Sequence, residues 1–267
     1  MNPIITHIDT ACCLIRIEEL TILTDPVLDE PGKRYHHGWG AFSKKTSTPA
    51  ISQEQLEDVD IVLLSHPQHK DNFDESGKAF AATVPTTLST PDIERKFPNG
   101  IGMRPWESHE LVLRSGAVLT ITATPAKHHP HWLPGFISGP VIGFMITHSS
   151  EPETLYISGD TIYFKGIGEI KARFPEITFA LLHAGGVQFP YLTGKGCYTM
   201  DNKGVQQMLE TLKPKLAIPI HTEGWSHFRE DTVALKAALK NATQQVQNCL
   251  HYIEAGIPVS LAELPSK

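Results

Sequence analysis

Short apolar runs, many of them β-branched, recur along the chain and are separated by polar loops. The runs at 12–17 and 20–24 are interrupted only by two glutamates, a pattern that predicts a β-hairpin. Later runs predict further strands, with a weaker signal near the C-terminus: 61–64, 84–88, 116–123, 141–147, 155–158, 179–182, 216–220, 249–253 and 258–261.

Helices are predicted between these strands. Residues 75–82 follow Asp74, a suitable N-cap. Residues 229–240 form a second candidate, and residues 201–212 form a third, which stops before Pro214 and has one apolar face: Val205, Met208, Leu209 and Leu212. Because strands alternate with helices while hairpins are mixed in, the pattern predicts a layered α/β fold with mixed sheets.

Two long loops are unusually rich in aromatic residues. Residues 29–50 contain Pro and Gly breakers together with His36, His37, Trp39 and Phe42. A loop of this length inside a compact domain is usually functional. We therefore expect it to form a lid or a pocket wall, with the aromatic loop at 127–140 on another side of the pocket.

Composition indicates an ordinary soluble protein and argues against several partners. The 267 residues are 40% hydrophobic and 19% charged, with a net charge of −6 and no Lys/Arg-rich run, which argues against binding nucleic acid or an anionic membrane. No apolar run approaches the length of a membrane span. The N-terminal residues lack a signal-peptide pattern and no Cys-x-x-Cys pair occurs, so we expect a cytoplasmic protein with free thiols.

Residues that can bind metals follow the predicted strands. The first such stretch carries His66, His69, Asp71 and Asn72 directly after an apolar strand. Other strands end on or near acidic residues or histidines: Asp25, His128, Asp160, His183 and His221. In layered α/β folds ligands bind beyond the strand ends, and imidazole and carboxylate groups are ligands for Zn, Mn and Fe. The pattern therefore predicts a metal site.

The order of these motifs resembles the metallo-β-lactamase-fold hydrolases. It runs His66…His69-x-Asp71, then His128, Ser158-Gly159-Asp160 and Pro219-Ile220-His221. Within that group the chain is similar to the L-ascorbate-6-phosphate lactonase-like branch, through Leu23-Thr24-Asp25-Pro26, Thr124-Pro125-Ala126-x-His128, Gly185-Gly186 and Tyr198-Thr199-Met200-Asp201. The resemblance covers roughly residues 4 to 230. It implies a single domain over residues 1–267, an αββα sandwich of two mixed β-sheets flanked by helices, with one or two metals at the sheet edges.

One motif departs from the family pattern His-x-His-x-Asp-His. Pro67 and Gln68 both separate the first two histidines, and Asn72 stands where the last histidine is expected. An ungapped alignment would make Gln68 and Lys70 ligands, which is chemically poor, so we prefer one extra residue after His66. The resemblance then implies two sites: His66, His69 and His128 in the first, and Asp71, Asp160 and His221 in the second, with Asp160 bridging and Asn72 as a weaker, neutral ligand.

Three further residues, Asp25, His183 and His129, have more than one interpretation, and His227 has one. Asp25 either caps a turn with Pro26 or supports the ligands, the role that the resemblance implies. His183 is either a core histidine or a supporting residue at the pocket. His129 competes with His128, and family spacing favours His128. His227 is the non-ligand residue best placed for substrate contact.

These assignments predict a metal-dependent hydrolase. One or two divalent metals, zinc foremost and manganese or iron next, would provide a metal-bound hydroxide that attacks an ester, lactone or amide-type small molecule. Asp71 would orient the nucleophile or take its proton, and His227 would contact the substrate. One alternative is a phospholipase D-like phosphodiesterase, which requires Lys127, Lys165 or Lys195 to converge on the pocket. Another is a degenerate, non-catalytic metal-binding module. The sequence leaves the oligomeric state open.

Overall fold

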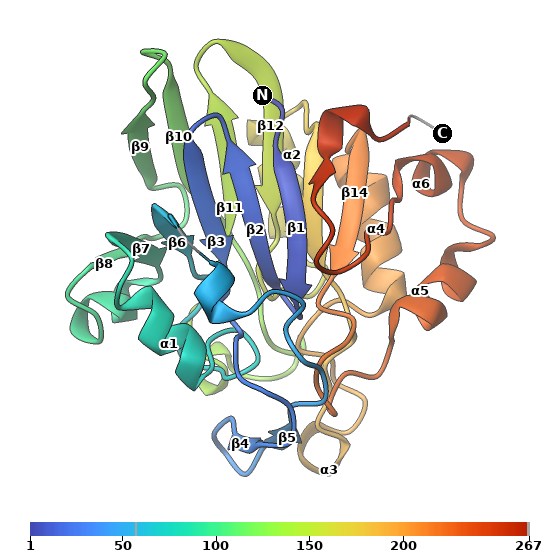
Figure 1. Cartoon of the computed structure of the whole chain (residues 1–267). Helices are drawn as coiled ribbons and strands as arrows, with labels where there is room; N and C mark the ends of the chain where they lie inside the picture. Colours follow the sequence, from blue (N-terminus) through green and yellow to red (C-terminus); the bar gives the residue numbers. More distant parts are fainter. Residues whose placement is uncertain (57, 266–267) are drawn as a thin grey trace.

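Two mixed β-sheets lie face to face in the computed structural model, which describes residues 1–56 and 58–265, and helices cover both outer faces (Figure 1). The first sheet pairs its N-terminal strands antiparallel and continues in parallel from the third strand. Its spatial order is β15 (Val259–Ser260), β1 (Ile4–Asp9), β2 (Cys12–Ile17), β3 (Leu20–Thr24), β6 (Ile61–Leu63), β7 (Thr86–Ser89) and β8 (Gly100–Gly102).

The second sheet is antiparallel at one side and parallel at the other. Its spatial order is β14 (Leu216–Ile220), β13 (Phe179–His183), β12 (Glu151–Ile157), β11 (Ile142–His148), β10 (Val118–Pro125) and β9 (Ser108–Val112). Strands β10, β12, β13 and β14 run in the same direction, so their carboxyl ends reach one edge of the sandwich.

Apolar side chains fill the space between the sheets and under the helices. The inner core includes Ile15, Leu63, Ile121, Phe144 and Ile218. Helix α1 (Glu75–Ala81) covers the first sheet, and the second is covered by α2 (Gly166–Arg173), α4 (Asn202–Leu212), α5 (Thr232–Leu239) and α6 (Gln244–Cys249). The αββα arrangement expected from the sequence is confirmed.

A small hairpin and a short helix lie together at one end of the sandwich. The hairpin, here called the lid, consists of β4 (Arg34–His36), β5 (Phe42–Lys44) and the turn between them. At its tip Gly38, Trp39 and Gly40 all have positive φ. Helix α3 (Pro190–Thr193) lies beside the lid at the bottom of Figure 1, and the backbone N–H of Phe42 donates to Tyr191 Oη at 2.8 Å.

Most predicted elements are present, and one is wrong. Helix α6 ends at Cys249, and residues 250–253 form no strand, although Leu250 makes an isolated bridge to Ala217. The apolar residues of that run pack against β14 without a ladder. The helix predicted at 229–240 begins later than expected because Asp231 caps it through a hydrogen bond from the N–H of Ala234. Among the described residues, no helix is long and apolar enough to span a bilayer.

Candidate metal centre

Three buried or partly buried histidines meet at the edge between the two sheets. His66 follows β6, His69 lies in the next loop, and His128 follows β10. His69 Nδ1 lies 3.0 Å from His66 Nε2 and 3.0 Å from His128 Nε2. We call this the three-histidine cluster. Its three nitrogens have roughly the separation of ligands around one tetrahedral Zn²⁺, whose Zn–N bonds are about 2.0–2.1 Å.

A buried relay orients the first of these histidines. Asp25 Oδ1 accepts hydrogen bonds from the N–H and the Oγ of Ser65, both at 2.8 Å. Because the Ser65 hydroxyl donates its proton to Asp25, it accepts from His66 Nδ1, which lies 2.8 Å away. His66 is then held with its Nε2 lone pair directed at the cluster, as supported metal ligands are.

A second group lies beside the first and contains more oxygen. Asp160 follows β12 and His221 follows β14. His221 Nε2 lies 3.5 Å from Asp160 Oδ1 and 4.0 Å from Asp71 Oδ2. We call Asp71, Asp160 and His221 the mixed cluster. His128 Nδ1 lies 3.7 Å from Asp160 Oδ2, so Asp160 lies beside a residue of the three-histidine cluster as well.

Polar groups from several segments surround the mixed cluster. His183 Nδ1 lies 2.9 Å from Asp160 Oδ1, and His183 Nε2 lies 3.8 Å from Asp25 Oδ2. The Asn72 amide lies 3.4 Å from both Asp160 Oδ1 and Ser65 Oγ, so its side chain is directed at the mixed cluster.

Two histidines flank Asp71 on the pocket side. His227 Nε2 is 2.9 Å from Asp71 Oδ2, and His37 Nδ1 is 3.6 Å from Asp71 Oδ1. Together these three residues make another group whose ligand-type atoms converge.

Burial and charge set the protonation of the site. Burial, reinforced by neighbouring imidazoles, lowers the pKa of His69 and His128 to about 4, and it holds the pKa of His66 well below its usual value. Burial alone would raise the pKa of Asp71 and Asp160. The surrounding imidazoles outweigh it and leave both pKa values below the usual range. His66, His69 and His128 are therefore neutral and both aspartates ionised at neutral pH, the states that bind metals.

Several buried atoms in the site have no hydrogen-bond partner among the described residues. They are Asp71 Oδ1, Asn72 Oδ1, His128 Nδ1, Asp160 Oδ2, His183 Nε2, His221 Nε2 and His227 Nδ1. His221 shows why a cation fits here. Its Nδ1 lies 3.3 Å from the carbonyl of Ala184, so Nδ1 carries the proton and the Nε2 lone pair faces two carboxylates. Facing acceptors repel one another unless a cation lies between them.

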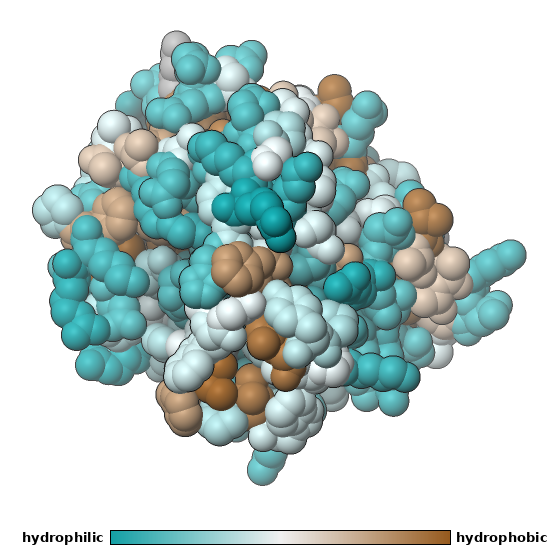
Figure 2. Space-filling model, turned by 90° about the horizontal axis from the view of Figure 1, so that it is seen from below, coloured by the Kyte–Doolittle hydropathy of each residue, from teal (hydrophilic) through white to brown (hydrophobic). Residues whose placement is uncertain are grey.

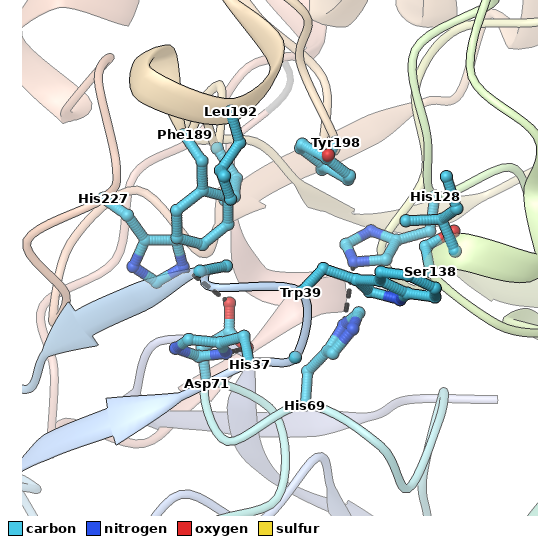
Figure 3. A pocket seen from close by; sticks show the side chains of 14 residues that line it. His37, Trp39, His69, Asp71, His128, Ser138, Phe189, Leu192, Tyr198 and His227 are labelled. Carbon is cyan, nitrogen blue, oxygen red and sulfur yellow. Dashed lines mark hydrogen bonds and ion pairs between the residues drawn. The ribbon is translucent and has the colours of Figure 1, made fainter.

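A pocket opens onto both clusters from the lid side. It is lined by His69, Asp71, His128 and His227 on the polar side, and Figure 3 shows these side chains converging with His37. The lid also contributes Trp39 and Ala41, so the expected proximity of this loop to the cluster is confirmed. The opposite wall is apolar: Val187, Phe189, Leu192 and Tyr198.

The pocket is narrow and its surroundings are apolar. Its water-accessible volume is about 40 Å³, enough for roughly three water molecules. Exposed apolar side chains lie around its mouth, with Trp39 70% exposed and Leu192 43% exposed. Figure 2 looks onto this end of the molecule and shows hydrophobic residues gathered there.

The sequence-predicted site residues converge. His66, His69, Asp71, Asn72, His128, Asp160 and His221 come together, with Asp25, His183 and His227 in contact with them. His129 lines a different groove, where its ring lies near Gly135. Two residues were missed: Ser65, whose hydroxyl joins Asp25 to His66, and His37, whose place depends on the folded lid.

Comparison with known proteins identifies related folds and sequences. The sequence matches the Beta-lactamase superfamily domain over residues 21–222. A UPF0173 metal-dependent hydrolase of Nanoarchaeum equitans is 28% identical over 191 residues, which cover 68% of this chain and 79% of that protein.

Two solved structures share the fold over nearly the whole chain. A possible metal-dependent hydrolase from Veillonella parvula superposes with a TM-score of 0.78 at 17% identity and covers 97% of this chain and 100% of that one. The isothiocyanate hydrolase from Delia radicum gut bacteria superposes with a TM-score of 0.76 at 22% identity and covers 96% and 98%.

Proposed function

We propose how the pocket works from the premise that the chain belongs to the beta-lactamase superfamily and is a metal-dependent hydrolase. The observation that carries the proposal is the pair of adjacent clusters, whose buried, unpartnered nitrogen and oxygen atoms converge. His66, His69 and His128 would hold one metal. Asp71, Asp160 and His221 would hold the other, with Asn72 beside it.

Donor chemistry suggests which metals these clusters take. Three neutral imidazoles suit Zn²⁺, while two carboxylates and one imidazole also suit Mn²⁺ or Fe²⁺. We therefore propose zinc for the three-histidine cluster, and zinc, manganese or iron for the mixed cluster.

The protein side chains would orient the reactants. Bound divalent metals supply a water of lowered pKa, about 7, and stabilise negative charge on a substrate oxygen. Asp71 lines the pocket, and its Oδ1 has no partner among the described residues, so it can accept a proton from the nucleophile or fix its direction. His227 also lines the pocket, and its buried Nδ1 is likewise without a described partner, so it can contact the substrate.

The pocket walls favour an uncharged substrate. Lys127, Lys165 and Lys195 are absent from the described residues that line the pocket, which weakens the phosphodiesterase alternative. The apolar wall and the small free volume suit an ester, lactone or amide whose reacting group enters while an apolar remainder lies outside. A lactone substrate would agree with the lactonase-like branch suggested by the sequence. We also propose that the protein is cytoplasmic, which suits the free thiols of Cys12, Cys13 and Cys197.

Metal analysis followed by a substrate screen tests this function. Protein purified without chelator should contain at least one transition metal per chain. The metal-free protein reloaded with Zn, Mn or Fe should then hydrolyse a member of a panel of lactones, esters, amides and phosphodiesters. His69→Ala should abolish binding of the first metal, while His129→Ala, a neighbouring histidine outside the pocket, should not. Protein that neither contains nor binds a metal would refute the proposal.

A further inference from the structure

The lid carries a histidine into the site, although nothing in the site motifs includes that residue. His37 belongs to the turn of the lid, and its Nδ1 lies 3.6 Å from Asp71 Oδ1, an oxygen with no hydrogen-bond partner among the described residues. The His37 side chain is only 4% exposed. Its ring centroid lies 5.1 Å from that of His227 and 5.8 Å from that of Phe189. The two imidazoles therefore form one wall of the pocket, with Asp71 between them.

The hydrogen bonds around His37 determine which of its ring nitrogens carries the proton. Ionised Asp71 can only accept, so His37 Nδ1 must carry the proton if the two groups are to attract. His37 Nε2 must then accept, and the Oγ of Ser43 lies 2.6 Å from it. The buried Ser43 hydroxyl thus donates to His37, and the His37 Nδ1–H is directed at Asp71. This arrangement requires no change in the charge of His37.

The two histidines that flank Asp71 are also joined through their backbones. The N–H of Lys44 donates to Ser226 Oγ at 2.9 Å, and the N–H of Ser226 donates to the carbonyl of Lys44 at 3.0 Å. The N–H of Thr46 donates to the carbonyl of Gly224 at 2.8 Å. His227 directly follows this ladder. These hydrogen bonds hold the lid against the segment that bears His227.

A buried ion pair fixes the base of the lid. The Lys45 side chain is fully buried and pairs with Asp9 at the end of β1. Asp9 also accepts a hydrogen bond from Ser47 Oγ at 2.6 Å. Because a buried charge is strongly destabilising without its partner, this ion pair holds the base of the lid against the first sheet.

We propose that His37 is a positioning residue: together with His227 it fixes the orientation of Asp71, so the closed lid completes the mixed cluster. This inference rests on the proposed function, since it takes Asp71 as a ligand of the second metal. Polar groups that orient metal ligands from outside typically contribute about 10–100-fold in metal affinity or activity, and His37 is such a group at 3.6 Å from Asp71 Oδ1. His37 should therefore affect the mixed cluster and leave the three-histidine cluster unchanged.

Metal titration of lid variants tests the inference without a substrate. His37→Leu keeps the volume and removes the donor, so it should weaken binding of the second metal equivalent about 10–100-fold and leave the first unchanged. His37→Asn places an amide N–H near the position of Nδ1 and should restore most of the affinity. Ser43→Ala leaves the imidazole in place and removes only its hydroxyl partner, so it should have an intermediate effect even if His37→Leu folds poorly.

The neighbouring histidine provides a matched control. His36 is exposed, points away on the same hairpin, and has its Nε2 3.2 Å from the N–H of Gly40. His36→Asn should titrate like the wild type. Cobalt-loaded protein gives a second readout, because visible absorption of the second Co²⁺ should change in His37→Leu and not in His36→Asn. On an active substrate, His37→Leu should lower kcat more than it changes KM.

Failure of the inference about His37 can be distinguished from failure of the proposed function. If His37→Leu binds both metal equivalents with wild-type affinity, His37 does not position Asp71, whatever the enzyme hydrolyses. If the wild-type chain binds no metal at all, the proposed function fails and this inference fails with it.

Discussion

The three-histidine cluster and the mixed cluster are adjacent but differ in what holds them. In the first, His66 Nε2 and His128 Nε2 each lie 3.0 Å from His69 Nδ1, and the Asp25–Ser65 relay supports His66. In the second, two ionised carboxylates are held by groups from distant segments, among them His183 beside Asp160 and His227 beside Asp71.

Both clusters draw on both sheets, but they differ in how many further segments support them. The geometry of the three-histidine cluster follows from two strand ends and one loop. The mixed cluster needs the ends of β12 and β14, the segment that bears His227 and, by our proposal, the lid. We therefore expect the mixed cluster to be the more sensitive of the two to substitutions outside its own ligands, and the following experiments test that expectation.

The largest effect should come from Asp160, which belongs to the mixed cluster and lies beside His128 of the three-histidine cluster. Asp160→Asn keeps the shape but removes the charge that His221 and His183 surround. We expect loss of the second metal equivalent, retention of the first, and a fall in kcat/KM of about 1,000-fold, since metal stabilisation supplies several kcal/mol. Metal titration and steady-state kinetics measure both quantities.

The control for this variant makes the same chemical change elsewhere. Asp231 caps α5, and asparagine caps helices equally well, so Asp231→Asn should resemble the wild type in metal content and kinetics. An Asp160→Asn protein that binds two equivalents, or retains activity within tenfold, would contradict the role assigned to this residue.

A glycine behind the mixed cluster should produce the next largest effect. Gly185 has a φ of +88°, and a Cβ there would lie 2.2 Å from the carbonyl oxygen of His221. Gly185→Ala should therefore displace His221, destabilise the fold by about 2–3 kcal/mol and weaken the second metal equivalent, while the first binds normally. Denaturant unfolding and metal titration test these effects.

Gly116→Ala is the control that measures the cost of a positive φ alone. Gly116 has a φ of +84°, but a Cβ there would meet no atom of the described residues within 4 Å, and it lies in the turn before β10, away from both clusters. Gly116→Ala should therefore cost only about 1 kcal/mol and leave both metals bound. Equal effects of the two substitutions on the second metal would show that Gly185 does not shape the cluster.

The same contrast explains what the sequence could predict. His66, His128, Asp160 and His221 follow apolar strands, and strand ends on one edge can be anticipated from local patterns. The role of His37 could not, because it depends on a lid that pairs with residues about 180 positions later, such as Lys44 with Ser226.

The fold shows the same division between local and tertiary information. Helix α2 escaped prediction because Gly166 and Gly168 disfavour a helix, yet Ile167 and Ile170 are fully buried and packing overrides propensity. Strand β9 escaped prediction because its residues alternate between exposed and half-buried at the edge of the sheet, without an apolar run.

A substitution at Asn72 should strengthen the second metal site, whereas the preceding variants weaken it. Its amide lies 3.4 Å from Asp160 Oδ1, and an imidazole there would donate more strongly than a carboxamide oxygen. Asn72→His should tighten the second metal equivalent about tenfold and leave the first unchanged. The variant is also expected to lose about 1–3 kcal/mol of stability, because Asn72 is fully buried and histidine is larger.

Asn72→Leu is the matched control, since it fills the site without a donor atom and should weaken the second equivalent. Unchanged second-site affinity in Asn72→His would mean that the alignment with one extra residue after His66 assigns Asn72 the wrong role.

The smallest effect concerns Asp29, a carboxylate outside both clusters that links the lid to α1. Burial alone would raise the pKa of Asp29, but hydrogen bonds from Ser76, Tyr35 and Lys33 outweigh it and lower the pKa to about 2. A carboxyl whose pKa is lowered by folding stabilises the protein above its unfolded value, about 3.9, and loses that contribution as the pH falls through the folded value. Wild-type stability should therefore drop between about pH 4 and pH 2 by roughly 1–2 kcal/mol from this group, after allowance for solvent screening.

Asp29→Asn should be less stable at pH 7 by a similar amount and should show a flatter profile in that acid window. Urea unfolding of metal-free wild type and variant at pH 2, 3, 4 and 7 measures the difference, and parallel profiles for the two proteins would exclude Asp29 as the source. Because Asp29 contacts neither cluster, both metal equivalents should still bind to the variant at pH 7, which separates stability of the lid base from assembly of the mixed cluster.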